Sequence, residues 1–183
     1  MKDKVIEVLG LGPSIQEYEP AGNEAIGVND IYRYHPADRL LLMDPPESFA
    51  RHRLKTIEGS RPVATYSHLP AWNFMPGFTL IGVAAPEHGG YVNSLDDFYC
   101  LPRHVDSTFT AVCLAYHFQA SDIVMYGVDF TDYHLVHYKD RIIQSYNRLH
   151  AALMQRGTLL WLGSDQGILA DFIPNWHKTL EVI

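Results

Sequence analysis

The stretch Val5-Ile6-Glu7-Val8-Leu9-Gly10-Leu11-Gly12-Pro13-Ser14 decides the fold class of this chain. A short apolar run leads into a glycine-rich turn, which predicts the first strand of a parallel sheet followed by a tight, phosphate-binding turn. Gly10 and Gly12 permit positive φ angles and let a ligand approach the backbone closely. Pro13 suits the first position of a helix, and Ser14 places a hydroxyl beside the N–H groups of that helix start. A purely structural turn is the alternative interpretation.

Length and composition are those of one globular domain. The chain has 183 residues, of which 47% are hydrophobic and 19% charged, so we expect a single domain with a sizeable core. The two cysteines, Cys100 and Cys113, lack metal-ligand spacing and are expected to be free thiols in a reducing compartment. No apolar run is long enough for a membrane span, and none has the form of a secretory signal. We therefore expect a cytoplasmic protein.

The charge balance is acidic. A formal net charge of −7 argues against nucleic acid as a partner, because non-specific binding to nucleic acid needs a basic surface. It does not exclude a local phosphate pocket, because backbone amides can bind an anion whatever the net charge. The sequence therefore favours a small-molecule ligand over a polynucleotide.

Apolar runs alternate with helical patterns along the chain. After the first strand, strands are predicted at 24–28, 39–43, 62–66, 78–83, 123–130 and 158–162, and helices at 15–20, 49–58, 107–119, 139–155 and 168–173. This alternation implies right-handed crossovers and a mostly parallel sheet with both faces covered. We predict an α/β fold, a Rossmann-like doubly wound sheet in a single domain spanning residues 1–183. Residues 84–105 show little periodicity and are predicted to form an irregular, lid-like segment.

Polar residues stand at the ends of three predicted strands. Asn29 follows strand 24–28, Asp44 follows strand 39–43, and Asp129 lies at the end of strand 123–130. Ligands of open α/β sheets bind outside the carboxyl ends of the strands, so these residues are candidates for a binding site. The alternatives are structural, because Asn29 suits an Asx turn and Asp129 can cap the turn after its strand.

Four separated segments carry a resemblance to a known superfamily. They are Gly10-Leu11-Gly12-Pro13-Ser14, Val28-Asn29-Asp30, Asp106-Ser107-Thr108 with the following Tyr126-Gly127-Val128-Asp129-Phe130, and the stretch from Trp161 to Phe172. In this order they resemble the small bacterial sialyltransferases that use CMP-sialic acid. They are also similar to the related DUF115 and archaeal 6-hydroxymethylpterin diphosphokinase-like proteins, and to short phage-encoded proteins of that superfamily.

The resemblance implies a nucleotide-binding transferase with a nucleotide-sugar donor such as a CMP-sugar. By position it assigns nucleotide contacts to Gly10, Gly12, Pro13, Ser14, Asn29, Ser107 and Thr108, and contacts with the leaving phosphate to Tyr133 and Tyr138. His134 and His137 lie near the place of the family's catalytic histidine. The chain departs from the family in two ways: Gly10 or Leu11 stands where the family's turn has Asn, and the lid after the Gly-x-Asp-Phe strand is shorter.

The two histidines admit more than one chemistry. A histidine suits deprotonation of an acceptor hydroxyl because its pKa lies near the working pH, so His134 and His137 are candidate catalytic bases. Surface or packing roles are the alternative. The His-x-x-His spacing, together with Asp129 and Asp132, also suggests a divalent-metal site. A diphosphokinase-like enzyme would use ATP with Mg²⁺, for which Asp44 and Asp129 are candidate ligands, although we expect no dedicated metal site.

Three functions stay open at this point. The first is a nucleotide-dependent transferase, the second an ATP-dependent diphosphokinase-like enzyme, and the third a non-catalytic phage or assembly protein that retains the fold. The chain is short beside the sialyltransferases it resembles. An acceptor site completed by a neighbouring subunit, and so a homo-oligomer, is therefore a further expectation.

Overall fold

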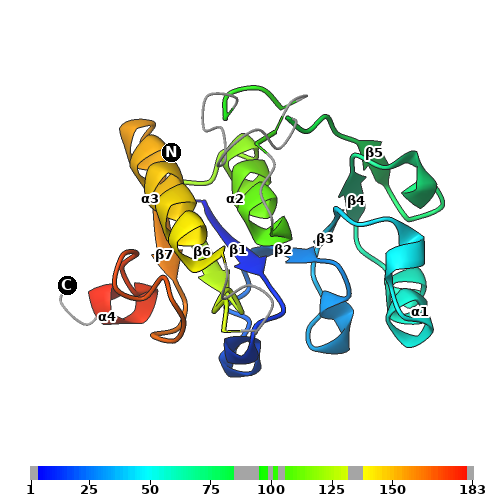
Figure 1. The fold of residues 1–183 in the computed structure, drawn as a ribbon, viewed down its shortest axis with the longest axis horizontal. Helices are drawn as coiled ribbons and strands as arrows, with labels where there is room; N and C mark the ends of the chain where they lie inside the picture. Colours follow the sequence, from blue (N-terminus) through cyan, green and yellow to red (C-terminus); the bar gives the residue numbers. More distant parts are fainter. Residues whose placement is uncertain (1–3, 85–94, 99–100, 103–105, 132–137, 181–183) are drawn as a thin grey trace.

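Seven parallel strands form one sheet in the structure, a computed structural model that describes residues 4–84, 95–98, 101–102, 106–131 and 138–180. The strands are β1 (Val5–Leu9), β2 (Glu24–Val28), β3 (Arg39–Leu42), β4 (Ala64–Ser67), β5 (Phe78–Leu80), β6 (Asp122–Tyr126) and β7 (Leu159–Leu162). Their order across the sheet is β5-β4-β3-β2-β1-β6-β7, and every neighbouring pair is parallel (Figure 1). The predicted doubly wound α/β fold is confirmed.

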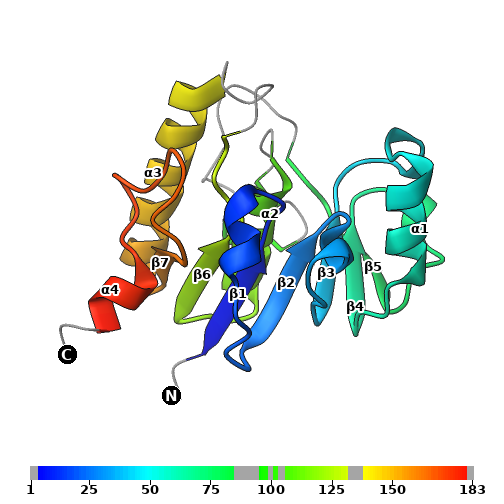
Figure 2. The ribbon, with the colours of Figure 1, turned by 90° about the horizontal axis from the view of Figure 1, so that it is seen from below.

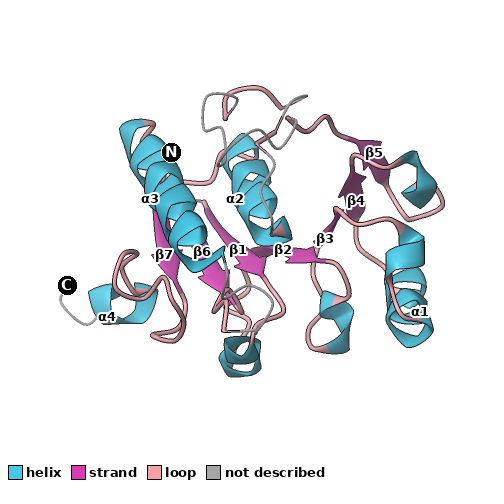
Figure 3. Ribbon diagram, in the orientation of Figure 1, coloured by secondary structure: helices cyan, strands magenta, loops and turns pink. Residues whose placement is uncertain are grey.

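Helices cover both faces of this sheet. They are α1 (Arg51–Gly59), α2 (Ser107–His117), α3 (Lys139–Gln155) and α4 (Trp176–Leu180), with the 3₁₀ helices η1 (Pro13–Glu17), η2 (Ile31–Arg33), η3 (Pro46–Ser48) and η4 (Pro70–Trp72). Helices α2 and α3 lie on one face, while η1, α1 and α4 lie on the other (Figures 1 and 3). Chain order reverses between β1 and β6, so this is the topological switch point at which open α/β sheets bind ligands.

Some helices and strands begin or end at residues other than those predicted from the sequence. Strand β6 ends at Tyr126 rather than at residue 130, because Gly127 has a φ of 65° and leaves the extended conformation. The predicted helix at 168–173 is wrong. That stretch forms turns whose Leu169 and Ile173 are buried, so its apolar spacing reflects burial and not a helix. A helix, α4, begins instead at Trp176.

Alternating residues of the strands fill two separate cores. In β1, Ile6 and Val8 point into the core beneath α2 and α3, whereas Leu9 joins the opposite core. Glu7 breaks this apolar pattern, since its carboxylate is buried on the central strand with only 2% of the residue exposed. It accepts hydrogen bonds from the Tyr18 hydroxyl at 2.5 Å and from Asn23 Nδ2 at 3.1 Å. Burial and this carboxylate raise the pKa of Tyr18, and the contact ties the end of η1 to the sheet.

A buried ion pair attaches α1 to the end of β2. Asp30 is fully buried and accepts from Arg53 Nη2 at 2.5 Å and Arg53 Nε at 2.9 Å, with Arg33 Nη1 at 3.2 Å. Burial alone would raise the pKa of Asp30, but its hydrogen bonds to the two arginines outweigh burial, and the pKa is lowered. The side chain of Arg53 therefore holds α1, which the sequence predicts as a helix over 49–58, against the end of β2.

The predicted lid-like segment 84–105 lies largely outside the described residues. Within its described part, Leu95 and Leu101 are buried in the core. Arg156 at the end of α3 donates from Nη2 to Asp96 Oδ2 at 2.6 Å, and this bond is the main reason that the pKa of Asp96 falls to about 2. The function of the segment as a lid stays a prediction. None of the helices in the described ranges combines the length and the apolar character needed to cross a bilayer.

We expect Asp30→Asn to lower the free energy of unfolding by about 1–3 kcal/mol, because it removes the charge from a buried, arginine-bonded carboxylate. The pKa of Asp30 is lower in the folded state, so its contribution is present above about pH 4 and is lost as the pH falls below that value. The difference between wild type and variant should therefore shrink in urea titrations carried out at progressively lower pH.

Asp165→Asn is the matched control, because the ion pair between Asp165 and Lys178 is exposed. We expect it to change the unfolding free energy by no more than about 0.5 kcal/mol at any pH. Equal losses in the two variants would contradict a structural function of the Asp30 ion pair.

Candidate functional site

A cavity of about 240 Å³ opens at the carboxyl edge of the sheet, between the ends of β1, β2, β3 and β6 and the start of α2. Leu11, Gly12, Pro13, Val28, Asn29, Asp44, Asp106, Ser107, Thr108, Gly127, Val128, Asp129, Phe130 and Thr131 line it. Figure 2 shows the ends of the central strands, η1 and the start of α3 gathered at this edge. The cavity lies at the switch point between β1 and β6, where the topology predicts a ligand.

Two glycines allow the strand ends to meet beneath the cavity. The Gly10 N–H donates to the Tyr126 carbonyl and the Gly12 N–H to the Gly127 carbonyl, both at 2.8 Å. A Cβ on Gly127 would lie only 2.7 Å from the Gly10 carbonyl oxygen, and the positive φ of Gly127 favours glycine in any case. The glycine-rich turn is therefore fixed against β6 by backbone contacts.

The Asp129 carboxylate also holds this turn in place, through hydrogen bonds from Ser14. Only 2% of the residue is exposed, and its carboxylate accepts from the Ser14 N–H at 2.7 Å and from the Ser14 hydroxyl at 2.5 Å. The amide and hydroxyl that the sequence predicts to bind a phosphate are thus engaged by a carboxylate of the protein itself. The Ile15 N–H also bonds internally, to the Gly12 carbonyl at 3.0 Å. The amides of Gly12, Ser14 and Ile15 all have protein partners in this conformation.

The wall formed by α2 is held by a second hydrogen-bonded acid, Asp106. Asp106 is the N-cap of α2 and accepts from the Phe109 N–H at 2.8 Å. The hydroxyls of Thr108 and of Tyr146 donate to the same carboxylate oxygen, the latter at 2.9 Å. Tyr146 comes from α3 and is fully buried, and burial first, then Asp106, raises its pKa well above the ordinary value. This network connects α3 to the cavity wall.

Asn29 carries an unsatisfied acceptor at the cavity. It follows β2 in a left-handed conformation with φ of 51°, which asparagine tolerates better than most residues. Its N–H donates to the Leu41 carbonyl at 3.0 Å, so its backbone is fixed. Its Oδ1 is buried and has no hydrogen-bond partner among the described residues. Buried side-chain oxygens are seldom left unpaired, so this atom is available for a ligand donor.

The charged residues among the described lining are all acidic: Asp44, Asp106 and Asp129. Asp44 is exposed at the end of β3, whereas Asp129 is buried. Across the described parts of the chain, no three histidine, cysteine, aspartate or glutamate side chains gather in a way that would hold a metal ion. The described wall is therefore rich in acceptors and carries negative charge.

The structure gathers a large part of the predicted site. Gly12, Pro13, Asn29, Ser107 and Thr108 all line the cavity, as do the two candidate metal ligands Asp44 and Asp129. Their placement at one edge follows from the parallel sheet, because the carboxyl ends of parallel strands meet at the same edge. The assigned roles of these residues stay predictions.

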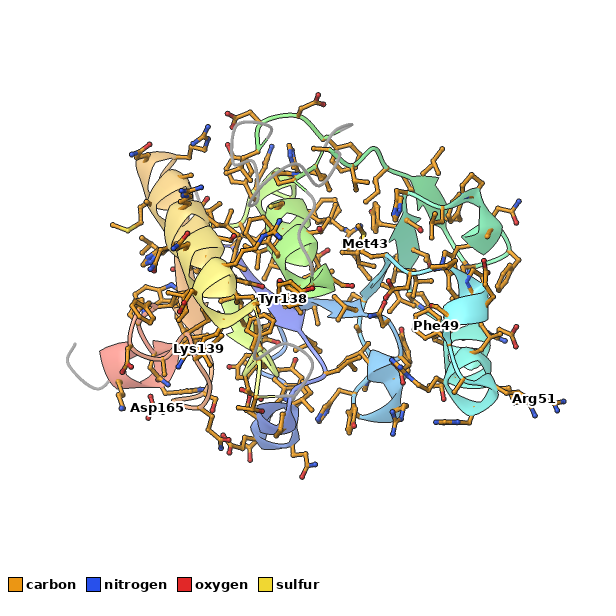
Figure 4. The ribbon with its side chains drawn as sticks, viewed as in Figure 1. Met43, Phe49, Arg51, Tyr138, Lys139 and Asp165 are labelled. Atoms are coloured by element: carbon orange, nitrogen blue, oxygen red, sulfur yellow. The ribbon has the colours of Figure 1, made fainter. Side chains whose placement is uncertain are left out.

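Other predicted residues lie elsewhere. Gly10 and Ser14 are buried beneath the cavity and do not line it. Tyr138, labelled in Figure 4, directly precedes α3 with 44% of the residue exposed, and it is not among the residues that line the cavity. Tyr133, His134 and His137 fall outside the described residues, so their predicted contacts stay predictions.

Sequence reasoning did not assign the apolar and polar wall residues Leu11, Val28, Asp106, Val128, Phe130 and Thr131. A usable signal existed for Asp106, which stands directly before a helix as a typical N-cap. The positive φ of Phe130, 51°, brings it to the cavity and has no signature in the sequence. Apolar wall residues such as Val28 are indistinguishable from core residues until the cavity is seen.

Comparison with solved structures finds sialyltransferases of Campylobacter jejuni. CstII in complex with the substrate analogue CMP-3FNeuAc aligns with a TM-score of 0.60 at 14% identity, covering 94% of this chain and 85% of CstII. The apo α-2,3-sialyltransferase aligns with a TM-score of 0.60 at 16% identity, covering 94% and 80%. The chain shares the sialyltransferase fold. No protein-family model matches the sequence, and no curated protein matches it significantly.

This likeness confirms the predicted resemblance to sialyltransferases at the level of the fold. CstII has also been solved with cytidine-5′-monophosphate, and that structure aligns with a TM-score of 0.60 at 13% identity. The resemblance to DUF115 and diphosphokinase-like proteins, and to phage proteins, stays a prediction.

We expect Gly12→Ala to destabilise the protein by about 1–3 kcal/mol, because the added Cβ is forced into a closely packed turn. It would lie 2.5 Å from Asp129 Oδ2 and 2.9 Å from the Gly127 carbonyl oxygen. The backbone of Gly12, with φ −67° and ψ 163°, is itself open to alanine, so the loss measures this contact alone. Chemical denaturation measures the change.

Gly59→Ala provides the comparison. A Cβ on Gly59, at the end of α1, meets no atom within 4 Å. We expect a change of no more than about 0.5 kcal/mol there, in the stabilising direction if any. If Gly12→Ala were equally neutral, the Asp129 carboxylate would not be held against the turn.

Proposed function

We propose that this protein is a transferase that uses a nucleotide-activated sugar and binds its nucleotide in the carboxyl-edge cavity. One observation carries the proposal: a cavity at the switch point joins Gly12, Asn29 and Thr108 from three separate segments. The unpaired Oδ1 of Asn29 supports a ligand with a hydrogen-bond donor at this position. The fold shared with enzymes solved with CMP and a CMP-sugar analogue supports a cytidine nucleotide as the first ligand to test.

The proposed reaction is a glycosyl transfer. An acceptor hydroxyl attacks the anomeric carbon of the donor sugar, the bond from that carbon to the phosphate oxygen breaks, and the nucleotide leaves with the electron pair. The acceptor proton passes to a general base, for which His134 and His137 are the candidates. Tyr133 and Tyr138 are candidates for hydrogen bonds to the departing phosphate. In this proposal the nucleotide is the leaving group.

The cavity is small for a whole donor. Its volume of about 240 Å³ lies below the roughly 300–1,000 Å³ that pockets for drug-sized ligands span. It suits one part of a nucleotide sugar, so the sugar and the acceptor would lie outside it. A neighbouring subunit that completes the acceptor site, and a cytoplasmic location, belong to the same proposal.

No observation favours the alternative functions. The neighbours have been solved with CMP and with a CMP-sugar analogue, which supports a cytidine nucleotide as the ligand to test before ATP. A fold retained without catalysis is the remaining alternative, and the absence of any nucleotide binding would favour it.

We expect Asn29→Gly to weaken CMP binding by about tenfold, because it removes the amide while glycine keeps the positive φ. Alanine is the poorer choice, since the conformation of Asn29 strains a residue with a Cβ. Isothermal titration calorimetry of the full chain with CMP, CDP, UDP and ATP gives the affinities, and selective binding of the cytidine nucleotides is expected.

Gln119→Gly is the matched control for this substitution. Gln119 also has a positive φ, 62°, and lies at the end of α2, outside the cavity lining. Its variant should bind CMP as the wild type does, and thermal unfolding should show both variants folded. Unchanged affinity in Asn29→Gly would place the nucleotide elsewhere, and no binding of any nucleotide to the wild type would overturn the proposed function.

A further inference from the structure

We infer that two copies of this chain associate through the outer edge of β5, in an antiparallel pairing centred on Thr79. Strand β5 is the last strand on its side of the sheet, separated from β1 by β4, β3 and β2 (Figure 1). This surface is distinct from the carboxyl-edge cavity, so the pairing goes beyond the proposed function. Three observations support it: the open backbone of β5, the exposed apolar side chains beside it, and the lack of charge around it.

The backbone of β5 uses only half of its hydrogen-bonding groups to pair with β4. The Ile81 N–H donates to the Ser67 carbonyl at 2.9 Å, in line with the register of the two strands. Along a parallel strand the N–H and C=O groups of alternate residues point to the same neighbour, so residues 77, 79 and 81 face β4. The N–H and C=O groups of Phe78 and Leu80 therefore point outward, away from the sheet.

Other parts of the two sheet edges are covered by this chain itself. Directly after β5, Val83 forms a parallel bridge with Leu101. At the opposite edge, the Leu162 N–H of β7 donates to the Pro174 carbonyl at 2.9 Å. Within the described ranges, no backbone bond reaches the outward groups of β5. An edge strand left open in this way is ready to pair with another chain.

Apolar side chains are exposed beside this open edge. Leu80 lies in β5, Phe74 lies in the turn before it and Val63 directly precedes β4, and each is more than half exposed. The Phe74 ring also packs against Trp72, which is fully buried, with the ring centroids 5.8 Å apart. The position of Phe74 is therefore fixed by the core, and covering these side chains would add a hydrophobic contribution to association.

The edge carries no charge. Residues 62–86 contain no lysine, arginine, aspartate or glutamate, although 19% of the chain is charged. Natural edge strands commonly carry charged residues that prevent pairing, and this edge lacks them. The exposed residues described here are Val63, Pro70, Ala71, Asn73, Phe74, Gly77 and Leu80. Two chains with a net charge of −7 each repel one another, so a second copy approaches most easily where neither surface is charged.

A two-fold axis at Thr79 pairs all the outward groups. Phe78 of one subunit then lies opposite Leu80 of the partner subunit, and each such pair exchanges two N–H···O bonds, so four form in all. The side chains of each pair lie on the same face of the combined sheet, where they contact one another.

This geometry leaves each carboxyl-edge cavity within its own subunit. The two sheets run in opposite directions, and β5 lies four strand spacings, about 20 Å, from β1. A neighbour that completes an acceptor site is therefore a separate contact.

Sedimentation equilibrium of the full chain, from about 1 μM to about 300 μM, measures the association. We expect a species of twice the 20.8 kDa of one chain, with a Kd of the order of 10 μM because so short a strand buries a small interface. Raising the salt concentration from about 0.01 M to about 0.1 M should lower the Kd about threefold, since it screens the repulsion between two acidic chains.

Leu80→Lys places a charge on the pairing edge and should raise the Kd at least about tenfold. Leu159→Lys is the matched control, because Leu159 is an exposed leucine of the other edge strand, β7, and the change in net charge is the same. Its Kd should equal that of the wild type. Both variants should bind CMP as the wild type does, because neither position lines the cavity.

Thr79→Cys tests the register directly. In the proposed pairing the two Thr79 residues form a pair without mutual hydrogen bonds, whose Cα atoms lie about 4.5 Å apart. That distance suits a disulfide, which spans about 4.4–6.8 Å between Cα atoms. We expect mild oxidation to link most of this variant into a dimer on a non-reducing gel. The wild type, with Cys100 and Cys113, and the exposed Met154→Cys variant are the controls and should stay largely unlinked.

A wild type that stays monomeric over the whole concentration range would overturn the inference. So would a dimer that Leu80→Lys and Leu159→Lys weaken equally, or one in which Thr79→Cys links no more than Met154→Cys. If thermal unfolding showed that Leu80→Lys is unfolded, the linking of Thr79→Cys would decide. A failure to bind any nucleotide would remove the proposed function and leave this pairing standing.

Discussion

The contact between Asp129 and Ser14 is the interaction on which the functional edge of this protein depends. It joins the turn after β1 to the turn after β6 across 115 residues of sequence, with bonds of 2.7 Å and 2.5 Å. A buried carboxylate is costly unless its oxygens are paired, and Ser14 pairs both of them. The glycines at positions 10 and 127 make the contact possible, because any side chain there would hold the two strand ends apart. The cavity floor is thus a consequence of this packing.

Other hydrogen-bonded carboxylates repeat this arrangement around the edge. Asp129 fixes η1, Asp106 caps α2 and holds Tyr146 of α3, and Asp30 binds Arg53 of α1. Each carboxylate accepts several hydrogen bonds, so each gives a rigid connection where loops alone would leave the helices free to move. The polar residues that end the strands of this sheet therefore serve structure first. The atoms available to a ligand are those without a hydrogen-bond partner in the protein. Among the described residues of the cavity, Oδ1 of Asn29 is the clearest example.

The sequence was sufficient for the fold because alternation of apolar runs and helical patterns is a local signal, and the parallel sheet then places strand ends at one edge. That is why Gly12, Asn29 and Thr108 could be predicted to converge. The pairing of Asp129 with Ser14 could not, since nothing local distinguishes it from an aspartate that caps its own turn. The burial of Glu7 could not be predicted either, because its partner Tyr18 comes from a different element. The helix at 168–173 was predicted wrongly for a similar reason. The spacing of apolar residues does not distinguish a buried turn from a buried helix.

Sharing a fold with the sialyltransferases therefore does not determine which groups the glycine-rich turn of this protein binds. The glycine-rich turn keeps the glycines, proline and serine of the family that it resembles, but has Gly10 or Leu11 where that family has asparagine. Leu11 lines the cavity with an apolar side chain, and Ser14 turns its amide and hydroxyl inward to Asp129. A turn can thus preserve its backbone geometry while some of its donors are engaged within the protein, because the geometry depends on glycine contacts and the donors depend on what bonds to them. In this protein the carboxylate of Asp129, supplied by the turn after β6, bonds to the Ser14 amide and hydroxyl.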